Sequence, residues 1–213
     1  MSDVAHTVTA VASSSSVDRA KQFLADCKCP TNASAYGSYS ELVEDPDVDI
    51  VYVATPHSHH YQNVMLCLLA GKHVLCEKAF TTNAAQTKKL IETAKEKNLF
   101  LMEAVWTRFF PMSVKIRKMI EEGELGDVHR VIADNSFGEK VEEVWGTRHR
   151  MVNMDLAGGA LLDRKYSALL LRLLHIVLGI ALFYADSLIP ISRHLQLDLG
   201  LPNDLSYSGS RGS

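Results

Sequence analysis

The stretch VDIVYVATPHSHHYQNVMLCLLAGKHVLCEK, residues 48–78, contains a strand-like run, a helical run and a second strand-like run. Residues 48–56 are almost continuously apolar, which is typical of a strand that is covered on both faces. Residues 59–72 follow with helical spacing and stop at Gly71, and residues 73–78 form the next strand-like run. A helix between two such strands predicts a right-handed crossover, which makes the strands parallel.

The same alternation extends on both sides of this stretch. Ser16 and Asn83 are placed to cap two helices, and Pro111 opens a third. Alternating strands and helices predict an α/β fold with a doubly wound parallel sheet. Further strands are expected at residues 7–13, 99–105 and 128–137, and further helices at 16–27, 83–98 and 111–126.

The composition is that of an ordinary globular protein, with 213 residues and a net charge of −3. No basic stripe is present for a phosphate backbone, so we expect no nucleic-acid partner. The four cysteines lack disulfide or zinc spacing and the N-terminus lacks the features of a secretory signal, which predicts a cytoplasmic protein. Arg172 and His175 interrupt the apolar run 168–185 and leave a stretch shorter than the ~20 residues needed to cross a membrane, so no membrane partner is expected.

Three unusual stretches follow expected strands: ATPHSHH (54–60), CEKAF (76–80) and EAVWTRFF (103–110). In an open α/β sheet ligands bind outside the carboxyl ends of the strands, so these stretches are expected to converge there. Glu77 and Lys78 would then lie at the mouth of a crevice. The alternative is that the two residues simply end a strand and reach water.

The motifs ATPHSHH, GKHVLCEKAFTTNAAQ, LFLMEAVWTRFFP and AGGALLD together resemble the glucose-fructose oxidoreductase/inositol dehydrogenase (Gfo/Idh/MocA) superfamily. LFLMEAVWTRFFP resembles its branch of dimeric dihydrodiol dehydrogenases and NADP-dependent D-xylose dehydrogenases. The resemblance implies an NAD(P)-dependent oxidoreductase that passes a hydride from a sugar or diol carbinol to nicotinamide. It also implies a homodimer with a Rossmann domain and a second α/β domain. The domains expected here are a dinucleotide-binding domain at 1–126, the start of the substrate domain at 127–163, and a divergent apolar tail at 164–213.

The resemblance places the catalytic lysine of the family's Glu-Lys-Pro motif at Lys78, where it takes part in proton transfer. Loss of hydride from a carbinol requires uptake of the hydroxyl proton, so a positioned amine suits this chemistry. The motif's proline is Ala79 here. The family's second catalytic group corresponds to Tyr166, which arrives one residue early after Asp163 and is therefore rotated by about 100° on a helix. Asp163 itself is expected on the substrate side.

The expected cofactor is NADP rather than NAD. NAD enzymes tend to place an acid after the second strand, whereas this chain offers Ser13 and Ser14 and no acid before Asp18. Serine-rich turns are also common at strand ends for local hydrogen bonding, which leaves that alternative open. By resemblance the cofactor-binding residues also include Thr55, Pro56, His57, His60, Glu77 and Lys78.

Trp106 and Phe109 are candidates for an aromatic wall against a sugar ring or cyclic diol, and core packing is the alternative. Arg108 is a candidate contact for a phosphate or an acidic group. His57, His59 and His60 are spaced like the ligands of a metal site, but no carboxylate or cysteine lies at ligand spacing from them. We therefore expect no metal and assign these histidines to a helix start.

Two departures from the family weigh against a complete enzyme. The first strand and its glycine-rich turn are missing, since no glycine precedes Gly37. Nothing after residue 163 resembles the family, so its dimer contacts are expected to be missing too. These departures predict an incomplete Rossmann sheet and weak or absent cofactor binding. A catalytically inactive fragment of such a dehydrogenase is the alternative function.

Overall fold

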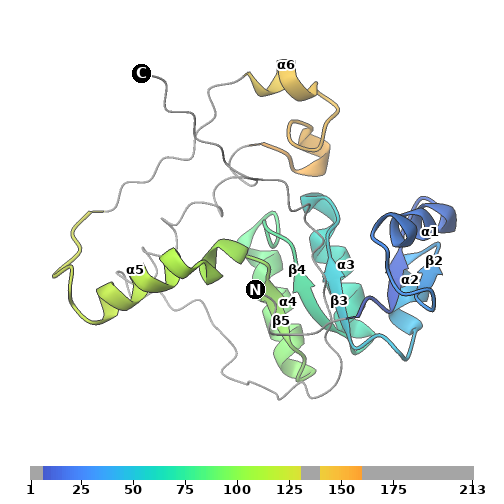
Figure 1. Cartoon of the computed structure of the whole chain (residues 1–213), viewed down its shortest axis with the longest axis horizontal. Coiled ribbons are helices and arrows are strands. Elements are labelled where there is room, and N and C mark those ends of the chain that lie inside the picture. The colour runs from blue at the N-terminus through green and yellow to red at the C-terminus, as the bar shows by residue number, and fades with distance from the viewer. Residues whose placement is uncertain (1–6, 131–139, 160–213) are drawn as a thin grey trace. The chain divides into compact units, whose positions relative to one another are not determined.

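The computed structural model describes residues 7–130 and 140–159, which form alternating strands and helices (Figure 1). Every strand pair among these residues is parallel. The described residues fall into two compact units, 7–48 and 49–159, and each is described by itself. The predicted α/β class with parallel strands is confirmed. The division at residue 48 lies inside the predicted first domain, and the boundaries at 126 and 163 stay predictions.

The first unit contains a two-stranded parallel sheet and two helices. Ser16 caps the first helix as predicted, because its side chain accepts a hydrogen bond from the Arg19 N–H. Ser38 and Glu41 form a capping box at the start of the second helix. The elements are β1 (Ala10–Ala12), α1 (Val17–Asp26), β2 (Ser34–Tyr36) and α2 (Tyr39–Glu44).

The second unit contains a three-stranded parallel sheet in the order β3-β4-β5. Val53 lies opposite Cys76, which in turn lies opposite Glu103, so the three strands end in line. The segments that follow them therefore leave from the same edge of the sheet. The elements are β3 (Ile50–Val53), α3 (His57–Leu69), β4 (His73–Cys76), α4 (Ala84–Glu96) and β5 (Leu101–Glu103).

The core of the second unit lies between this sheet and the helices α3 and α4, which pack against each other. Val64 and Leu68 of α3, Val74 of β4 and Leu90 of α4 are fully buried. Burial raises the pKa of the neighbouring Cys67 thiol to about 12, which makes it an inert core residue.

The predicted start and end of α3 need correction. The helix begins at His57 and ends at Leu69, whereas residues 59–72 were expected. Pro56 takes the N-cap position, so the histidines that follow it are already helical. Gly71, with a φ of +80°, follows the C-cap residue and ends the helical conformation as predicted.

After β5 the chain enters short helical segments. The helix expected at 111–126 ends earlier, at Glu121. Of the strand expected at 128–137, residues 128–130 are irregular and the rest lies outside the described residues. Asp163, Tyr166 and the tail 164–213 also lie outside them. Within the described ranges, no helix has the length and apolar character needed to cross a membrane. The remaining elements are η1 (Trp106–Phe109), α5 (Pro111–Glu121), α6 (Val141–Trp145) and η2 (Met154–Leu156).

Candidate active site

The segments after β3, β4 and β5 meet at the carboxyl edge of the sheet in the second unit. The Glu77 N–H donates to the Val53 carbonyl at 2.9 Å, and the Ala104 N–H donates to the Cys76 carbonyl at 2.7 Å. These bonds continue the sheet one residue past the end of each strand. The convergence expected from the sequence is therefore confirmed for the stretches that begin at residues 54, 76 and 103.

Lys78 lies on the loop that leaves β4 at this edge. Lys78 is half-buried, whereas the next two residues, Ala79 and Phe80, are buried. The peptide bond between Lys78 and Ala79 is cis, although residue 79 is not proline. The loop then reaches α4 through Thr81, whose hydroxyl donates to the Asn83 carbonyl at 2.8 Å.

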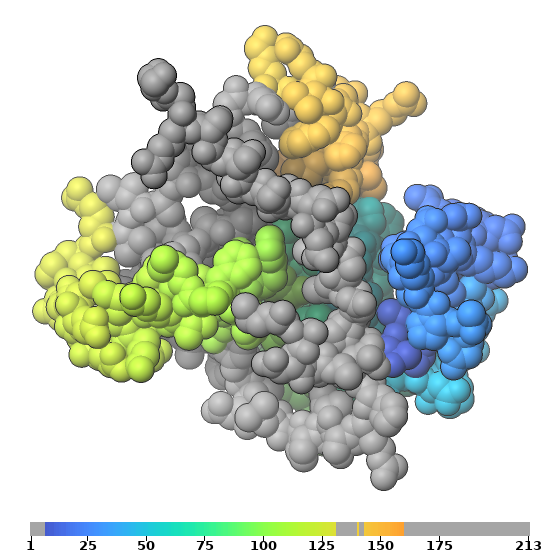
Figure 2. All heavy atoms as spheres, viewed as in Figure 1, coloured from blue at the N-terminus to red at the C-terminus, as the bar shows by residue number. Residues whose placement is uncertain are grey.

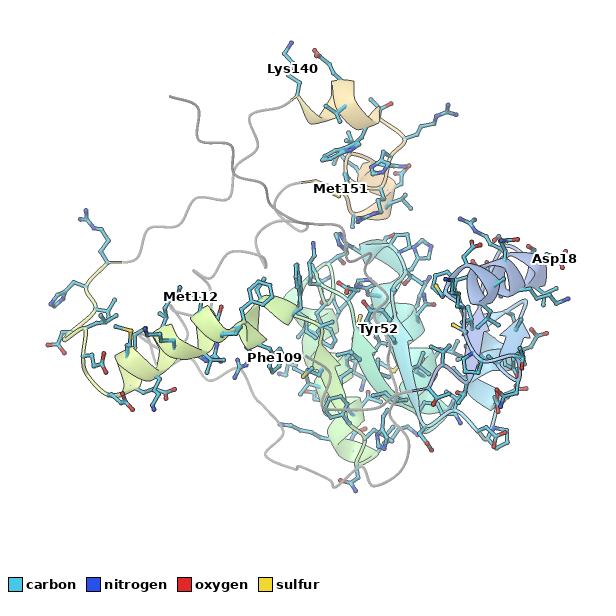
Figure 3. All side chains as sticks on the ribbon, viewed as in Figure 1. Asp18, Tyr52, Phe109, Met112, Lys140 and Met151 are labelled. Atoms are coloured by element: carbon cyan, nitrogen blue, oxygen red, sulfur yellow. The ribbon has the colours of Figure 1, made fainter. Side chains whose placement is uncertain are left out.

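The Glu77 carboxylate contacts the sheet with one oxygen and the loop with the other. Its Oε1 accepts a hydrogen bond from the hydroxyl of Tyr52 of β3, which Figure 3 labels, and its Oε2 accepts one from the Lys78 backbone N–H at 3.1 Å. Burial raises the pKa of Tyr52, and the hydrogen bond to Glu77 raises it further. The phenol therefore stays a hydrogen-bond donor. A direct effect of Glu77 on the Lys78 amine stays a prediction.

His60 is fully buried and joins two of the loops. Its Nδ1 lies 2.7 Å from the Ala79 carbonyl oxygen, and its Nε2 lies 2.7 Å from the Thr55 carbonyl oxygen. Burial lowers the pKa of His60, while the two carbonyls oppose that shift. A direct contact between His60 and a cofactor stays a prediction.

His57, at the first position of α3, reaches a different segment. Its Nδ1 lies 3.1 Å from the Ala157 carbonyl oxygen, and its ring meets that of His60 edge to face with centroids 5.6 Å apart. Ala157 begins the AGGALLD motif, so α3 contacts this motif through His57. Among the described residues, no group of three or more His, Cys, Asp or Glu side chains could hold a metal ion.

Glu103 is a site residue that the sequence reasoning missed. It ends β5, and its Oε1 accepts a hydrogen bond from the Phe80 N–H at 2.9 Å. The signal was present in the sequence, because HVLCE and LFLME both end an apolar run with glutamate. The two carboxylates, Glu77 and Glu103, thus hold N–H groups on either side of Ala79.

The aromatic residues after β5 are exposed rather than packed in the core. Trp106 is 59% and Phe109 60% exposed, and Trp106 packs edge to face on Phe110 with ring centroids 5.0 Å apart. The segment from η1 through α5 lies at the surface of the second unit (Figure 2). The core alternative is therefore wrong for these two side chains. The Arg108 carbonyl accepts a hydrogen bond from Arg117 Nη1 at 2.9 Å, and a ligand contact by Arg108 stays a prediction.

Ser13 and Ser14 belong to the first unit, in the turn between β1 and α1. The hydroxyls of Ser13 and Ser15 lie 2.9 Å apart, and the Tyr39 hydroxyl donates to Ser14 Oγ at 3.4 Å. The turn is thus stabilised locally, as the alternative interpretation expected. Ser14 remains exposed and can still donate to a ligand.

The family model for the Gfo/Idh/MocA proteins, described as an oxidoreductase family with an NAD-binding Rossmann fold, matches residues 2–105. The chain belongs to the Gfo/Idh/MocA oxidoreductase family. This match includes the Glu77–Lys78 pair and all three strands of the second unit.

Two curated Gfo/Idh/MocA relatives are similar along most of the chain. The chain is 62% identical over 165 residues to D-xylose 1-dehydrogenase (NADP⁺) of Hypocrea jecorina. This alignment covers 76% of this chain and 42% of the relative. The chain is 46% identical over 158 residues to trans-1,2-dihydrobenzene-1,2-diol dehydrogenase of Macaca fuscata fuscata, which covers 74% of this chain and 44% of the relative. The chain thus spans less than half the length of these relatives.

A solved structure of the same kind is the aldose-aldose oxidoreductase of Caulobacter crescentus complexed with glycerol. It superimposes with a TM-score of 0.62 at 27% identity, covering 80% of this chain and 49% of that one.

Proposed function

We propose that the protein is an NADP-dependent dehydrogenase that oxidises a carbinol of D-xylose, of a related aldose or of a cyclic trans-dihydrodiol. The observation that carries this proposal is the position of Lys78, on a loop held at the carboxyl edge of the sheet. The identity of 62% to a D-xylose 1-dehydrogenase and of 46% to a dihydrodiol dehydrogenase supports the two substrate classes.

The residues of this chain fit NADP in part. Ser13 and Ser14 offer hydroxyl donors that suit a ribose 2′-phosphate, and Asp18, the next acid along the chain, pairs with Lys21 at 3.8 Å. A glycine-rich turn would bind the pyrophosphate, but no glycine precedes Gly37. We therefore expect residues 1–213, expressed by themselves, to bind NADP weakly.

When NADP⁺ is bound, it accepts the hydride that leaves the carbinol carbon. Lys78 Nζ takes up the hydroxyl proton as the C=O bond forms and then releases it to solvent. The charge that this amine gains stabilises alkoxide character on the substrate oxygen. The exposed faces of Trp106 and Phe109 offer apolar contact for the substrate ring.

The test is turnover by the full 213-residue chain, with D-xylose and with the trans-dihydrodiol, followed by NADPH absorbance at millimolar NADP⁺. Lys78→Met should lower turnover by about 10² to 10⁴, the range for a positioned acid-base group, while NADP⁺ affinity is retained. Lys89→Met is the control, because Lys89 is exposed on α4. Unchanged turnover in Lys78→Met would remove Lys78 from the mechanism.

A second candidate is a chain without catalysis. Within residues 1–213 no glycine precedes Gly37, so this chain expressed by itself lacks the usual turn for the pyrophosphate. This candidate predicts a folded chain that turns over neither substrate and binds NADP⁺ no tighter than roughly millimolar. Micromolar binding in calorimetry would exclude it.

A further inference from the structure

The loop around Lys78 is held by side chains of α3 and β5 and by the side chain of Glu77, which directly follows β4. The Lys78 N–H donates to Glu77 at 3.1 Å, the Phe80 N–H donates to Glu103 at 2.9 Å, and the Ala79 carbonyl lies 2.7 Å from His60 Nδ1. Three consecutive residues thus each have one backbone group engaged by an ionisable side chain. We call these three contacts the loop clamp.

Glu103 contributes the contact that fixes the far side of the loop. Its partner Phe80 is only 8% exposed, so the N–H would have little access to water without the carboxylate. A hydrogen bond from a buried N–H to a carboxylate is among the stronger kinds in proteins, and a buried donor left without a partner is costly. Loss of the Glu103 carboxylate should therefore release residues 78–80.

His60 contributes the contact that ties this loop to the neighbouring one. Its ring lies between the carbonyls of Thr55, after β3, and Ala79, after β4. Because the ring is fully buried, its orientation is fixed by packing within α3 and against the two loops. A shift of either loop therefore displaces the other.

We propose that Glu103 and His60 are positioning residues that set the direction of the Lys78 amine by holding the backbone of residues 79 and 80. The proposal rests on the proposed role of Lys78 in proton transfer. Neither residue needs to touch the substrate, because each acts on the loop backbone rather than on the reacting atoms.

The test compares Glu103→Ala with Glu103→Gln in the full chain. Hydrogen exchange of the Phe80 amide, measured by NMR, should accelerate about tenfold or more in Glu103→Ala and stay near wild type in Glu103→Gln, whose amide oxygen still accepts. The Gln86 amide, which the Asn83 side chain caps at 3.0 Å, is the internal reference for general unfolding.

The second readout is the rate at which an acylating reagent modifies Lys78, measured by mass spectrometry relative to the exposed Lys89. Glu103→Ala and His60→Leu should each change this ratio by about threefold or more relative to the wild type. Glu103→Gln and His60→Gln should keep the wild-type ratio, because glutamine at either position can still make the required hydrogen bond. An unchanged ratio in both Glu103→Ala and His60→Leu would overturn the proposal, as would acceleration of Phe80 and Gln86 together. Neither readout uses NADP or turnover, so a chain that passes this test and fails the turnover assay contradicts only the proposed function.

Discussion

Gly158→Ala should lower the free energy of unfolding of the second unit, because Gly158 lies in the tight turn that brings Ala157 to His57 of α3. A Cβ at this position would lie 2.6 Å from the Arg150 carbonyl oxygen and 2.8 Å from that of Asn153. The Gly158 N–H donates to the same Asn153 carbonyl at 2.9 Å, so the turn cannot open there without losing a bond. The adjacent Ala157 carbonyl is the one that His57 contacts.

The size of the effect follows from these distances. Ordinary contact at 3.4 Å requires the Arg150 carbonyl to move by about 0.8 Å, and both obstructing atoms are backbone. Overpacking of this kind costs roughly 1–3 kcal/mol, and two backbone overlaps in one turn place the cost near the upper end. Gly146→Ala is the matched control. Gly146 has a φ of +72°, and a Cβ added there would have no neighbour within 4 Å. Gly146→Ala should therefore lower the free energy of unfolding only through the left-handed backbone conformation, by about 1 kcal/mol.

Urea unfolding followed by Trp145 fluorescence measures both variants. Trp145 stacks on His149 with ring centroids 5.8 Å apart, next to the turn, and a Trp106→Phe background removes the chain's other tryptophan. We expect Gly158→Ala to lose about 2 kcal/mol more than Gly146→Ala. Equal losses would show that the turn is not packed as described and would refute the reasoning.

Two further predictions concern Tyr52, which contacts Glu77 of the loop clamp, and His60, which belongs to the clamp. Because the pKa of Tyr52 is raised in the folded state, the unfolded state loses the phenol proton at a lower pH, and the free energy of unfolding should fall as pH rises above 10. In urea titrations Tyr52→Phe should lack this pH dependence. A variant that keeps the wild-type dependence would contradict the assignment to Tyr52. The pKa of His60 is lowered in the folded state, so below pH 6.5 the unfolded state binds more protons and the free energy of unfolding should fall as pH drops. His60→Gln should reduce the slope of the free energy of unfolding against pH by at most about 1.4 kcal/mol per pH unit. An unchanged slope would contradict the assignment to His60.

Helix caps could be predicted from sequence because they depend on a few adjacent residues. Ser16 and Asn83 cap α1 and α4 where expected. Helical spacing predicts the start of α3 at residue 59, two residues after its actual start at His57. Its buried residues His57, His60 and Val64 are nevertheless spaced three and four apart, which is the period of one helix face. That spacing marks the histidines as inward-facing helical residues rather than loop residues.

The elements β2 and α2 were not predicted. Residues 34–36 read SAY, which is too short and too polar to give an apolar run. The Ser38–Glu41 capping box was a readable local signal for the helix that follows. Short strands of this kind are specified by their neighbours more than by their own sequence.

The position of the candidate site at the strand ends could be predicted, but the contacts that hold it could not. Parallel strands necessarily end at a common edge, which brings the loop with Lys78 to that edge. The bond from Phe80 to Glu103 joins residues 23 apart in the chain, and its formation depends on the register of β4 and β5. No local pattern encodes that register directly.

The loop clamp also explains how alanine can stand at position 79, where the family motif has proline. The clamp uses the Lys78 N–H, the Ala79 carbonyl and the Phe80 N–H. None of these is the N–H that proline lacks, so alanine and proline at this position leave the same three groups available. Ala79 itself is fully buried, and its small side chain fits without exposing the loop. On this proposal the direction of Lys78 depends on Glu77, directly after β4, on Glu103, at the end of β5, and on His60 of α3.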